Sequence, residues 1–444
     1  MATPLDFPSQ SDKSEGMITR WLRRTSPAAF STYAIIAAFS TYFCMYAFRK
    51  GFSATTFHDM GAPIGMENDL KSYFVIAQVL GYALSKWLGI KFVSEMSSAR
   101  RGITLVLLIG IAESALALFA ITPAPWNIAW CFVNGMPLGM VWGIVFAFLE
   151  GRRTSEALGA GLSASFIIAS GVVKTVGQVV LGWGVSEAAM PFVVGALFFP
   201  GFLFFTWMLT TLPKPNNTDE AQRTRREPMD GGARKAFFKA YLPGLLPLTL
   251  LHFLLTALRG VRDDFAKEIW EGLGYDGTPS VLSITELFVA LGVMIGLGLL
   301  MLVKDNKKAI ITVQAMRGGG AALVGIATLL YDLGVLSPFV WMVLVGLGLY
   351  LAYVPFGAML FDRLIAAVGW VGTAGFMIYV TDAVGYLGQV TVNVVKEVGA
   401  HDVAWLDFFR VLAYATSVVC VAAFAWGMYY FARRARHRGD HAVT

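Results

Sequence analysis

Residues 27–49 read PAAFSTYAIIAAFSTYFCMYAFR. An α-helix needs about 20 mostly apolar residues to cross the roughly 30 Å hydrocarbon core of a membrane, and this segment is long enough. It also contains Arg49, whose guanidinium keeps its charge and costs about 3 kcal/mol at membrane depth on insertion scales. The segment therefore predicts a membrane-spanning helix with a functional charge, the alternative being that Arg49 reaches out to the headgroups from the end of its helix.

A second apolar segment repeats the pattern 210 positions later, where Thr256-Ala257-Leu258-Arg259 corresponds to Tyr46-Ala47-Phe48-Arg49. Residues 177–179 and 388–390 both read Gly-Gln-Val, at nearly the same offset. Matches at one offset indicate two parallel halves related by an axis along the membrane normal, with a site between them near the midplane. Two guanidiniums at equivalent positions predict a site for an anion such as a phosphate, whose oxygens match their planar forks.

The composition is that of a helical membrane protein. Of the 444 residues, 56% are hydrophobic and 14% are charged, whereas soluble domains carry about 25% charged residues. The alternating ten-residue strands of a membrane β-barrel are not evident. The net charge of +6 is explained by basic residues that face anionic membrane lipid, so we expect no nucleic-acid partner. Cysteines occur only at 44, 131 and 420, inside apolar runs, which argues against a disulfide framework or a metal site.

The fold class predicted from these patterns is all-α and polytopic, with twelve transmembrane helices in two pseudo-symmetric six-helix bundles. The twelve expected spans are 27–48 with a continuation towards 57, 72–90, 103–121, 126–149, 158–185, 190–212, 242 to beyond 259, 281–303, 310–331, 338–360, 366–395 and 405–431. A polar linker, 214–241, divides the chain into bundles at 27–213 and 242–431, with tails at 1–26 and 432–444. The first apolar run is interpreted as a span and not as a cleavable leader.

Lysine and arginine placement predicts the orientation, because cytoplasmic loops are enriched in both residues. With the N-terminus inside, the outer loops hold only Lys71, Lys267 and Lys396. The remaining loop cations gather at 13–24, 91–101, 152–153, 214–239, 304–308, 363 and 433–438. We therefore expect a multi-pass protein of the inner (cytoplasmic) membrane with both termini in the cytoplasm.

Four stretches resemble the major facilitator superfamily and, within it, the organophosphate:phosphate antiporters, which exchange glycerol phosphate or hexose phosphates for inorganic phosphate. The stretches are 42–50, 81–89, 258–261 and 372–388. The resemblance implies that Arg49 and Arg259 grip the phosphate and that Lys86 adds charge. It also implies that the second span packs near the eleventh and the fifth near the eighth. The histidine of that family's fifth helix has no counterpart in residues 166–170, and the chain also looks like an uncharacterised bacterial branch of the superfamily.

Other polar residues inside the expected spans complete the candidate site. Tyr42 and Tyr46 share the helix face of Arg49, and Tyr379 of the eleventh span is a third candidate for binding substrate oxygens. Lys174 and Glu286 are expected at the same depth, where a pair between them would cancel two buried charges. Asp382 could pair with Lys86 or carry a proton. For each of these three, the alternatives are a static structural pair and a coupling role.

The remaining charged residues in or near the spans have simpler interpretations. Lys50 and Arg262 are expected to snorkel outward or to steer the ligand. Arg317 and Arg410 are expected to snorkel or to pair between helices. His252 is interpreted as a packing or hydrogen-bonding residue in preference to a proton relay.

These observations predict a secondary transporter of a phosphorylated or other small anionic metabolite, by exchange for inorganic phosphate through rocker-switch alternating access. The alternatives are a proton-coupled symporter of an organic anion and a membrane sensor that binds such a ligand without transporting it. An enzyme is not expected, because no nucleophile–base–acid set, metal cluster or cofactor motif is apparent. We expect no cofactor and a monomer.

Overall fold

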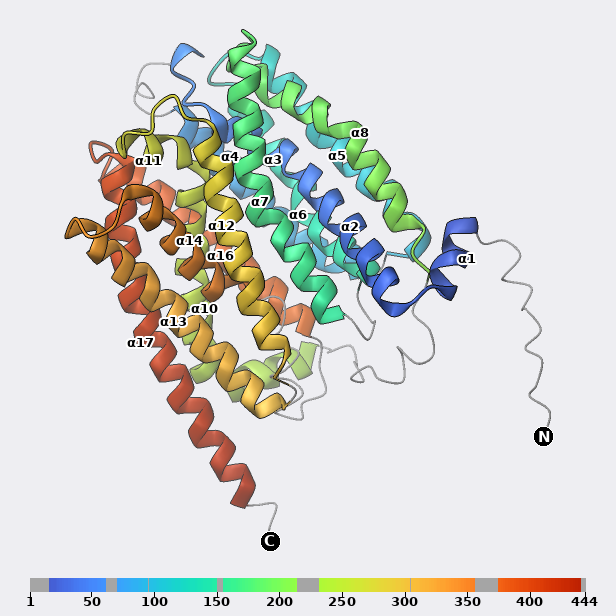
Figure 1. Cartoon of the computed structure of the whole chain (residues 1–444), viewed down its shortest axis with the longest axis vertical. Helices are drawn as coiled ribbons and strands as arrows, with labels where there is room; N and C mark the ends of the chain where they lie inside the picture. The colour runs from blue at the N-terminus through green and yellow to red at the C-terminus, as the bar shows by residue number, and fades with distance from the viewer. Residues whose placement is uncertain are drawn as a thin grey trace.

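The computed structural model describes residues 16–60, 70–94, 96–149, 155–213, 231–303, 305–355 and 374–440. Within these ranges all regular secondary structure is helical, and most of the helices run the length of the molecule (Figure 1). The predicted all-α, polytopic architecture is therefore confirmed. The predicted linker between the bundles falls mostly at residues 214–230, outside the described part of the chain.

Among its described residues the first half contains six long helices and four short elements. They are α1 (Met17–Arg24), α2 (Pro27–Met45), α3 (Ala47–Lys50), η2 (Gly51–Ala54), η3 (His58–Met60), α4 (Leu70–Ser94), α5 (Ser98–Ile121), α6 (Ile128–Leu149), α7 (Ser155–Gly182) and α8 (Met190–Thr210).

The second half contains six long helices and one short helix among the described residues. They are α10 (Gly231–Asp264), α11 (Ala266–Gly272), α12 (Ser280–Met301), α13 (Asn306–Asp332), α14 (Pro338–Pro355), α16 (Ala374–Gly399) and α17 (Trp405–Asp440). The end of the molecule that holds η2 and α11 is called the α11 end below. The opposite end, which holds α1 and the last turns of α17, is called the termini end (Figure 1).

Nine helices of the described residues are long and apolar enough to cross a membrane. The other three expected spans coincide with α4, α10 and α16, which have 25, 34 and 26 residues. Each exceeds the roughly 20 residues that a crossing requires. Residues 356–373, which include parts of the tenth and eleventh expected spans, lie outside the described chain.

Residues 17–24 form the short helix α1, although they fall in a segment that the sequence predicts as a polar tail. The helix has one side that packs on the first bundle, because Leu22 is buried and the ring of Trp21 lies edge-on to that of Tyr33 at 6.4 Å. The hydroxyl of Thr19 donates to the carbonyl of Thr211 at 2.9 Å. This packing against α2 and the end of α8 fixes a segment that hydropathy alone cannot place.

The two halves meet along α4 with α16 and along α7 with α12, as the resemblance implies for the second and eleventh and for the fifth and eighth spans. Gly171 allows the second contact. A Cβ atom on this residue would lie 2.2 Å from the carbonyl oxygen of Leu282 on α12, far inside van der Waals contact. The glycine therefore sets how closely the two halves approach.

Candidate functional site

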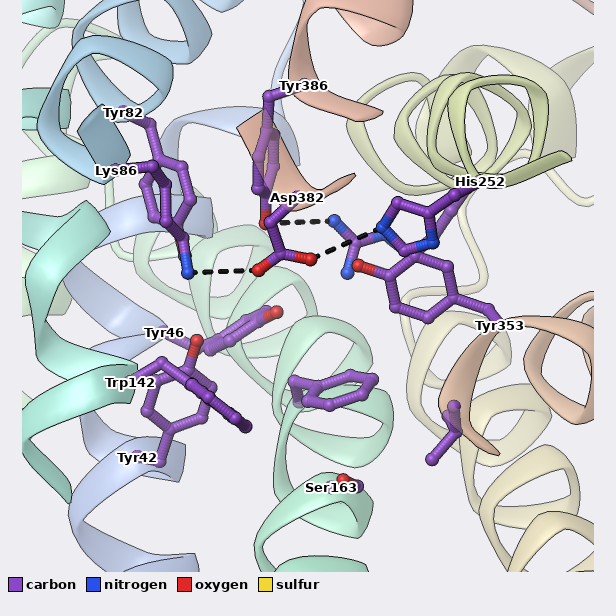
Figure 2. A pocket seen from close by; sticks show the side chains of 13 residues that line it. Tyr42, Tyr46, Tyr82, Lys86, Trp142, Ser163, His252, Tyr353, Asp382 and Tyr386 are labelled. Carbon is purple, nitrogen blue, oxygen red and sulfur yellow. Dashed lines mark hydrogen bonds and ion pairs between the residues drawn. The ribbon is translucent and has the colours of Figure 1, made fainter. Parts of the chain in front are cut away.

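A cavity lies between the halves at the middle of the molecule (Figure 2). Its walls are strongly aromatic and carry two cationic side chains, one carboxylate and one histidine. The lining residues are Tyr42, Tyr46, Tyr82, Lys86, Trp142, Ser163, Phe166, His252, Arg259, Tyr353, Val354, Asp382 and Tyr386. The cavity volume of ≈ 60 Å³ has room for a few water molecules, so a metabolite would need the halves to move.

Arg259 extends into this cavity from α10. Its Cζ lies 4.6 Å from the centre of the Tyr353 ring, and its Nη2 donates to the hydroxyl of Tyr386 at 3.2 Å. The side chain is 8% exposed. In the described part of the chain no carboxylate forms an ion pair with Arg259, so tyrosines are the groups that surround its charge.

Arg49 is buried in a similar setting in the first half, on the short helix α3. Its Cζ lies 4.1 Å from the ring centre of Tyr82 and 5.6 Å from that of Tyr386. No described carboxylate pairs with it, and its Nε donates no hydrogen bond to a described residue. The residues that line the cavity include Arg259 but not Arg49. The Tyr82 ring lies against the Arg49 guanidinium, and direct binding of one ligand by both arginines stays a prediction.

The end of the first span carries Arg49. Helix α2 ends at Met45, and after Tyr46, whose backbone angles are helical (φ -62°, ψ -25°), α3 and the 3-10 helix η2 continue the chain. The carbonyl of Phe48 accepts from Nδ2 of Asn134, and that of Arg49 accepts from Nε2 of Gln78, both at 3.0 Å. These amides satisfy backbone oxygens that would otherwise be unpaired inside a membrane. They fix the backbone that carries the guanidinium.

Lys86, Asp382 and His252 form a chain of contacts across the cavity (Figure 2). Nζ of Lys86 and Nε2 of His252 each lie 3.3 Å from one oxygen of the Asp382 carboxylate, and the His252 ring stacks on Tyr353 at 5.0 Å. The predicted pairing of Asp382 with Lys86 is thus present, and it joins the two halves. His252 also belongs to the cavity, which the packing interpretation of the sequence did not include.

Tyrosines of both halves form most of the aromatic wall. Tyr42 and Tyr46 line the cavity, as their helical spacing from Arg49 suggests, and Tyr379 belongs to a stretch of α16 whose side chains lie outside the described structure. Tyr82 and Tyr386 were not predicted. Each lies four residues from a charged residue of its own helix, Lys86 or Asp382, and this i,i+4 spacing, which puts both on one helix face, could have identified them.

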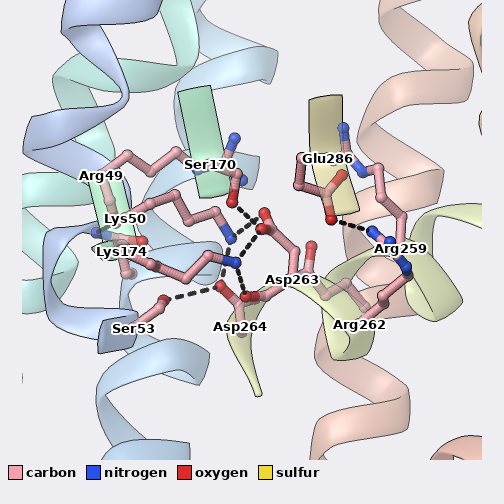
Figure 3. A network of polar contacts seen from close by, with 12 residues as sticks. Arg49, Lys50, Ser53, Ser170, Lys174, Arg259, Arg262, Asp263, Asp264 and Glu286 are labelled. Atoms are coloured by element: carbon pink, nitrogen blue, oxygen red, sulfur yellow. Dashed lines mark hydrogen bonds and ion pairs between the residues drawn. The ribbon is translucent and has the colours of Figure 1, made fainter. Parts of the chain in front are cut away.

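A second group of charges closes the α11 end (Figure 3). Lys50 contacts both Asp263, at 2.8 Å, and Asp264. Lys174 contacts Asp263 at 2.8 Å, and Lys71 contacts Glu268 at 2.7 Å. The lysines belong to the first half and the carboxylates to the second, so every pair crosses between the halves. These six residues are called the α11-end cluster.

The structure corrects three predictions about these charges. Lys174 does not form its ion pair with Glu286, which pairs with Arg262 at 2.6 Å. Lys50 and Arg262 do not snorkel, because both are buried in ion pairs. The reason is that α10 continues unbroken beyond Arg259 to Asp264 and brings two carboxylates to the first half. The run Arg262-Asp263-Asp264 was the available signal, but only its arginine was considered as a candidate and its two carboxylates were missed.

The other two spanning arginines lie away from the cavity. Arg410 of α17 pairs with Asp332 at the end of α13, at 2.6 Å, which is the predicted helix-to-helix pairing. Arg317 is fully buried, and its Nε donates to the carbonyl of Ala352 at 3.0 Å. Neither residue lines the central cavity of the described structure.

Residues 51–434 match the model of a family of unknown function, DUF5690. No curated protein matches the chain. Among solved structures, the fold is similar to that of the major facilitator superfamily proton:xylose symporter XylE bound to 6-bromo-6-deoxy-D-glucose. The TM-score is 0.64 at 11% identity, over 91% of this chain and 96% of the other.

A POT family transporter in complex with 5-aminolevulinic acid is also similar, with a TM-score of 0.58 at 13% identity, over 88% of this chain and 96% of the other. Identities this low bear on the fold alone. The chain therefore has the major facilitator fold and is a multi-pass membrane protein. The finer resemblance to organophosphate:phosphate antiporters stays a prediction.

Proposed function

We propose that this chain, which belongs to the DUF5690 family, is a secondary transporter of a small organic anion, with phosphorylated metabolites as the first class to test. The observation that carries the proposal is the state of its buried cations. Arg49 and Arg259 come from opposite halves, are almost fully buried and have no carboxylate partner in the described chain. A buried charge without a counter-charge costs several kcal/mol, and a bound anion would remove that cost.

The walls of the cavity suit an organic anion. The Arg259 guanidinium lines the cavity and offers a planar fork for the oxygens of a phosphate or carboxylate, and Arg49 lies behind the Tyr82 ring. The rings of Tyr42, Tyr46 and Trp142 offer apolar surface and hydroxyl or indole donors for the rest of the molecule. Pockets for small molecules commonly combine aromatic walls with a few charged groups in this way.

The inter-half contacts suit alternating access. The α11-end cluster seals one end of the cavity through ion pairs that must break if the halves rock apart there. The predicted orientation places this end outside the cell. A ligand that bridges Arg49 and Arg259 would draw the halves together, so its binding could bias the equilibrium between the two conformations. Exchange for inorganic phosphate is the mode that the resemblance implies.

Counterflow in proteoliposomes tests the proposal. Purified protein would be reconstituted with inorganic phosphate, glycerol 3-phosphate, glucose 6-phosphate or an organic carboxylate inside, and uptake of the labelled compound would be measured. We expect saturable counterflow of at least one anion, and a loss of 30-fold or more in Arg259→Gln, since truncating a buried charge contact costs about 2–5 kcal/mol. Arg410→Gln is the control, because this arginine lies outside the cavity. Equal losses in both variants, or no anion counterflow, would refute the proposal.

Proton-coupled symport of the anion is a second candidate, which the Lys86–Asp382–His252 contacts favour. A carboxylate held by a lysine of the first half and a histidine of the second can couple its protonation to the closure between them. In this case a pH gradient, acidic outside, would drive accumulation without internal phosphate. Asp382→Asn should then abolish accumulation while counterflow persists. Accumulation that is the same with and without the gradient would leave exchange as the mode.

A further inference from the structure

Tyr82 and Tyr386 form a pair that joins the two halves at the centre of the molecule. Tyr82 belongs to α4 and Tyr386 to α16, and their ring centres lie 4.6 Å apart with the planes tilted by 56°. Both side chains are almost completely buried. Figure 2 shows the two rings beside the Lys86–Asp382 contact. The pair is therefore a contact between the halves that depends on ring packing.

Both central guanidiniums contact this pair. The Cζ of Arg49 lies 4.1 Å from the Tyr82 ring centre and 5.6 Å from that of Tyr386. The Cζ of Arg259 lies 5.8 Å from the Tyr386 ring centre, and its Nη2 donates to the Tyr386 hydroxyl at 3.2 Å. All three Cζ-to-ring distances fall within the roughly 6 Å over which a cation is attracted to a ring face. One aromatic pair thus contacts two like charges from opposite halves.

We propose that Tyr82 and Tyr386 take the place of the anion when none is bound, so that the carrier can close and reorient without cargo. The negative ring faces and the Tyr386 hydroxyl oxygen partly offset two cations that would otherwise repel each other across the closing cavity. If the proposed function holds, the protein would catalyse net movement of its anion as well as exchange. A carrier with unscreened arginines would be restricted to exchange.

The arrangement separates this role from ligand binding. Arg49 does not line the cavity, because the Tyr82 ring lies against it. For Arg49 to reach an anion, this ring must move aside, and the anion then takes over the electrostatic role of the ring. Tyr82 and Tyr386 are accordingly positioning residues for the arginines, and a substitution should change the conformational equilibrium of the ligand-free protein.

Distance measurements on ligand-free protein test this role. Spin labels at Trp126→Cys and Val335→Cys would report the α11-end separation of the halves, because both positions are exposed and belong to different halves. The three native cysteines are buried and should resist labelling. In Tyr82→Leu/Tyr386→Leu we expect the fraction of molecules with the short, closed distance to fall at least fivefold. Tyr386→Phe, which keeps the ring, should show a much smaller change.

Removing one of the two central arginines from the double variant decides between screening and packing. If the rings act by screening, Arg49→Met in the Leu/Leu background should restore most of the closed fraction, because a single guanidinium has no like charge to repel. If the rings act only by packing, Arg49→Met will not restore it, and the proposal is overturned. If the double variant does not fold, the closed fraction would be compared in Tyr82→Leu with and without Arg49→Met.

A transport measurement distinguishes failure of this inference from failure of the proposed function. In proteoliposomes, glycerol 3-phosphate or any anion that gives counterflow would be measured for counterflow and for net efflux into ligand-free buffer. Because Tyr82 lines the cavity, Tyr82→Leu can lower both rates, and we expect net efflux to fall at least tenfold more than counterflow. If wild-type protein shows counterflow but net efflux is the same in wild type and variant, the inference is refuted and the proposed function is not. Absence of counterflow in wild type would refute the proposed function, while the spin-label result would still decide the role of the rings.

Discussion

At the α11 end, Lys50, Lys71 and Lys174 each meet a carboxylate of the other half, whereas at the centre Arg49 and Arg259 meet tyrosine rings. Both groups of cations are buried, and both lie where the halves touch. The difference is that carboxylates balance the charges of the first group, whereas the arginines of the second have no carboxylate partner among the described residues. Paired charges stabilise one conformation. A buried cation without a counter-charge is unfavourable, and a bound anion can lower that free-energy cost.

The largest expected effect comes from breaking ion pairs of the α11-end cluster. In Asp263→Asn, Lys174 loses its carboxylate and Lys50 keeps only Asp264, and breaking a buried pair costs about 3–5 kcal/mol. We expect this end to open in most molecules. A cysteine at Ser53, a buried residue beside Asp264, would then react at least tenfold faster with a membrane-impermeant maleimide.

The control for that experiment is Glu286→Gln. This variant breaks an equally buried ion pair, with Arg262, but both partners belong to the second half. It can destabilise the bundle without separating the halves. If the Ser53 cysteine becomes equally reactive in both variants, the α11-end cluster does not act as a contact that closes this end.

The second prediction compares the direction in which two substitutions, each removing one cation, shift the unfolding temperature. Lys174→Met leaves Asp263 with one cation fewer and should lower the apparent unfolding temperature of the ligand-free protein. Arg49→Met removes a buried charge that has no described counter-charge and should raise it, by about 1 °C per kcal/mol for a chain of this length. Thermal unfolding followed by tryptophan fluorescence would measure both shifts. Shifts in the same direction would remove the distinction between balanced and unbalanced cations.

The sequence predicted the helical membrane fold and several residues of the site, and the reasons for its failures are physical. Hydropathy and a repeated offset are properties of the chain itself, so they located Arg49 and Arg259, whereas the packing of the halves was implied by the resemblance. The choice of ion-pair partners is different, because it depends on where helices end and bend in three dimensions. The charge run at 262–264 and the i,i+4 spacing of Tyr82 and Lys86 were visible in the sequence, but the partners of Asp263 and Tyr82 in the other half were not.

The third prediction tests the approach of the halves without altering any charge. In Gly171→Ala the added methyl group would meet the carbonyl oxygen of Leu282 at 2.2 Å, so α7 and α12 must move apart. Overpacking of this kind costs about 1–3 kcal/mol. We expect a longer α11-end distance between spin labels, smaller than the change in Asp263→Asn. Gly182→Ala in the same helix is the matched control, because its Cβ would meet nothing within 4 Å, and an equal change there would show that helix propensity is responsible.

The smallest effect is expected at Arg410, which tests whether any ion pair of this protein would behave like the α11-end cluster. Its pair with Asp332 is as short as the buried ones, at 2.6 Å, but the Arg410 side chain is 35% exposed. Exposed ion pairs contribute about 0–1 kcal/mol, since solvent screens them and side-chain entropy opposes them. Arg410→Gln should therefore shift the unfolding temperature by less than Lys174→Met and leave the α11-end distance unchanged. If Arg410→Gln shifts the unfolding temperature as much as Lys174→Met does, the stability of the α11-end cluster does not depend on its burial or on its position between the halves.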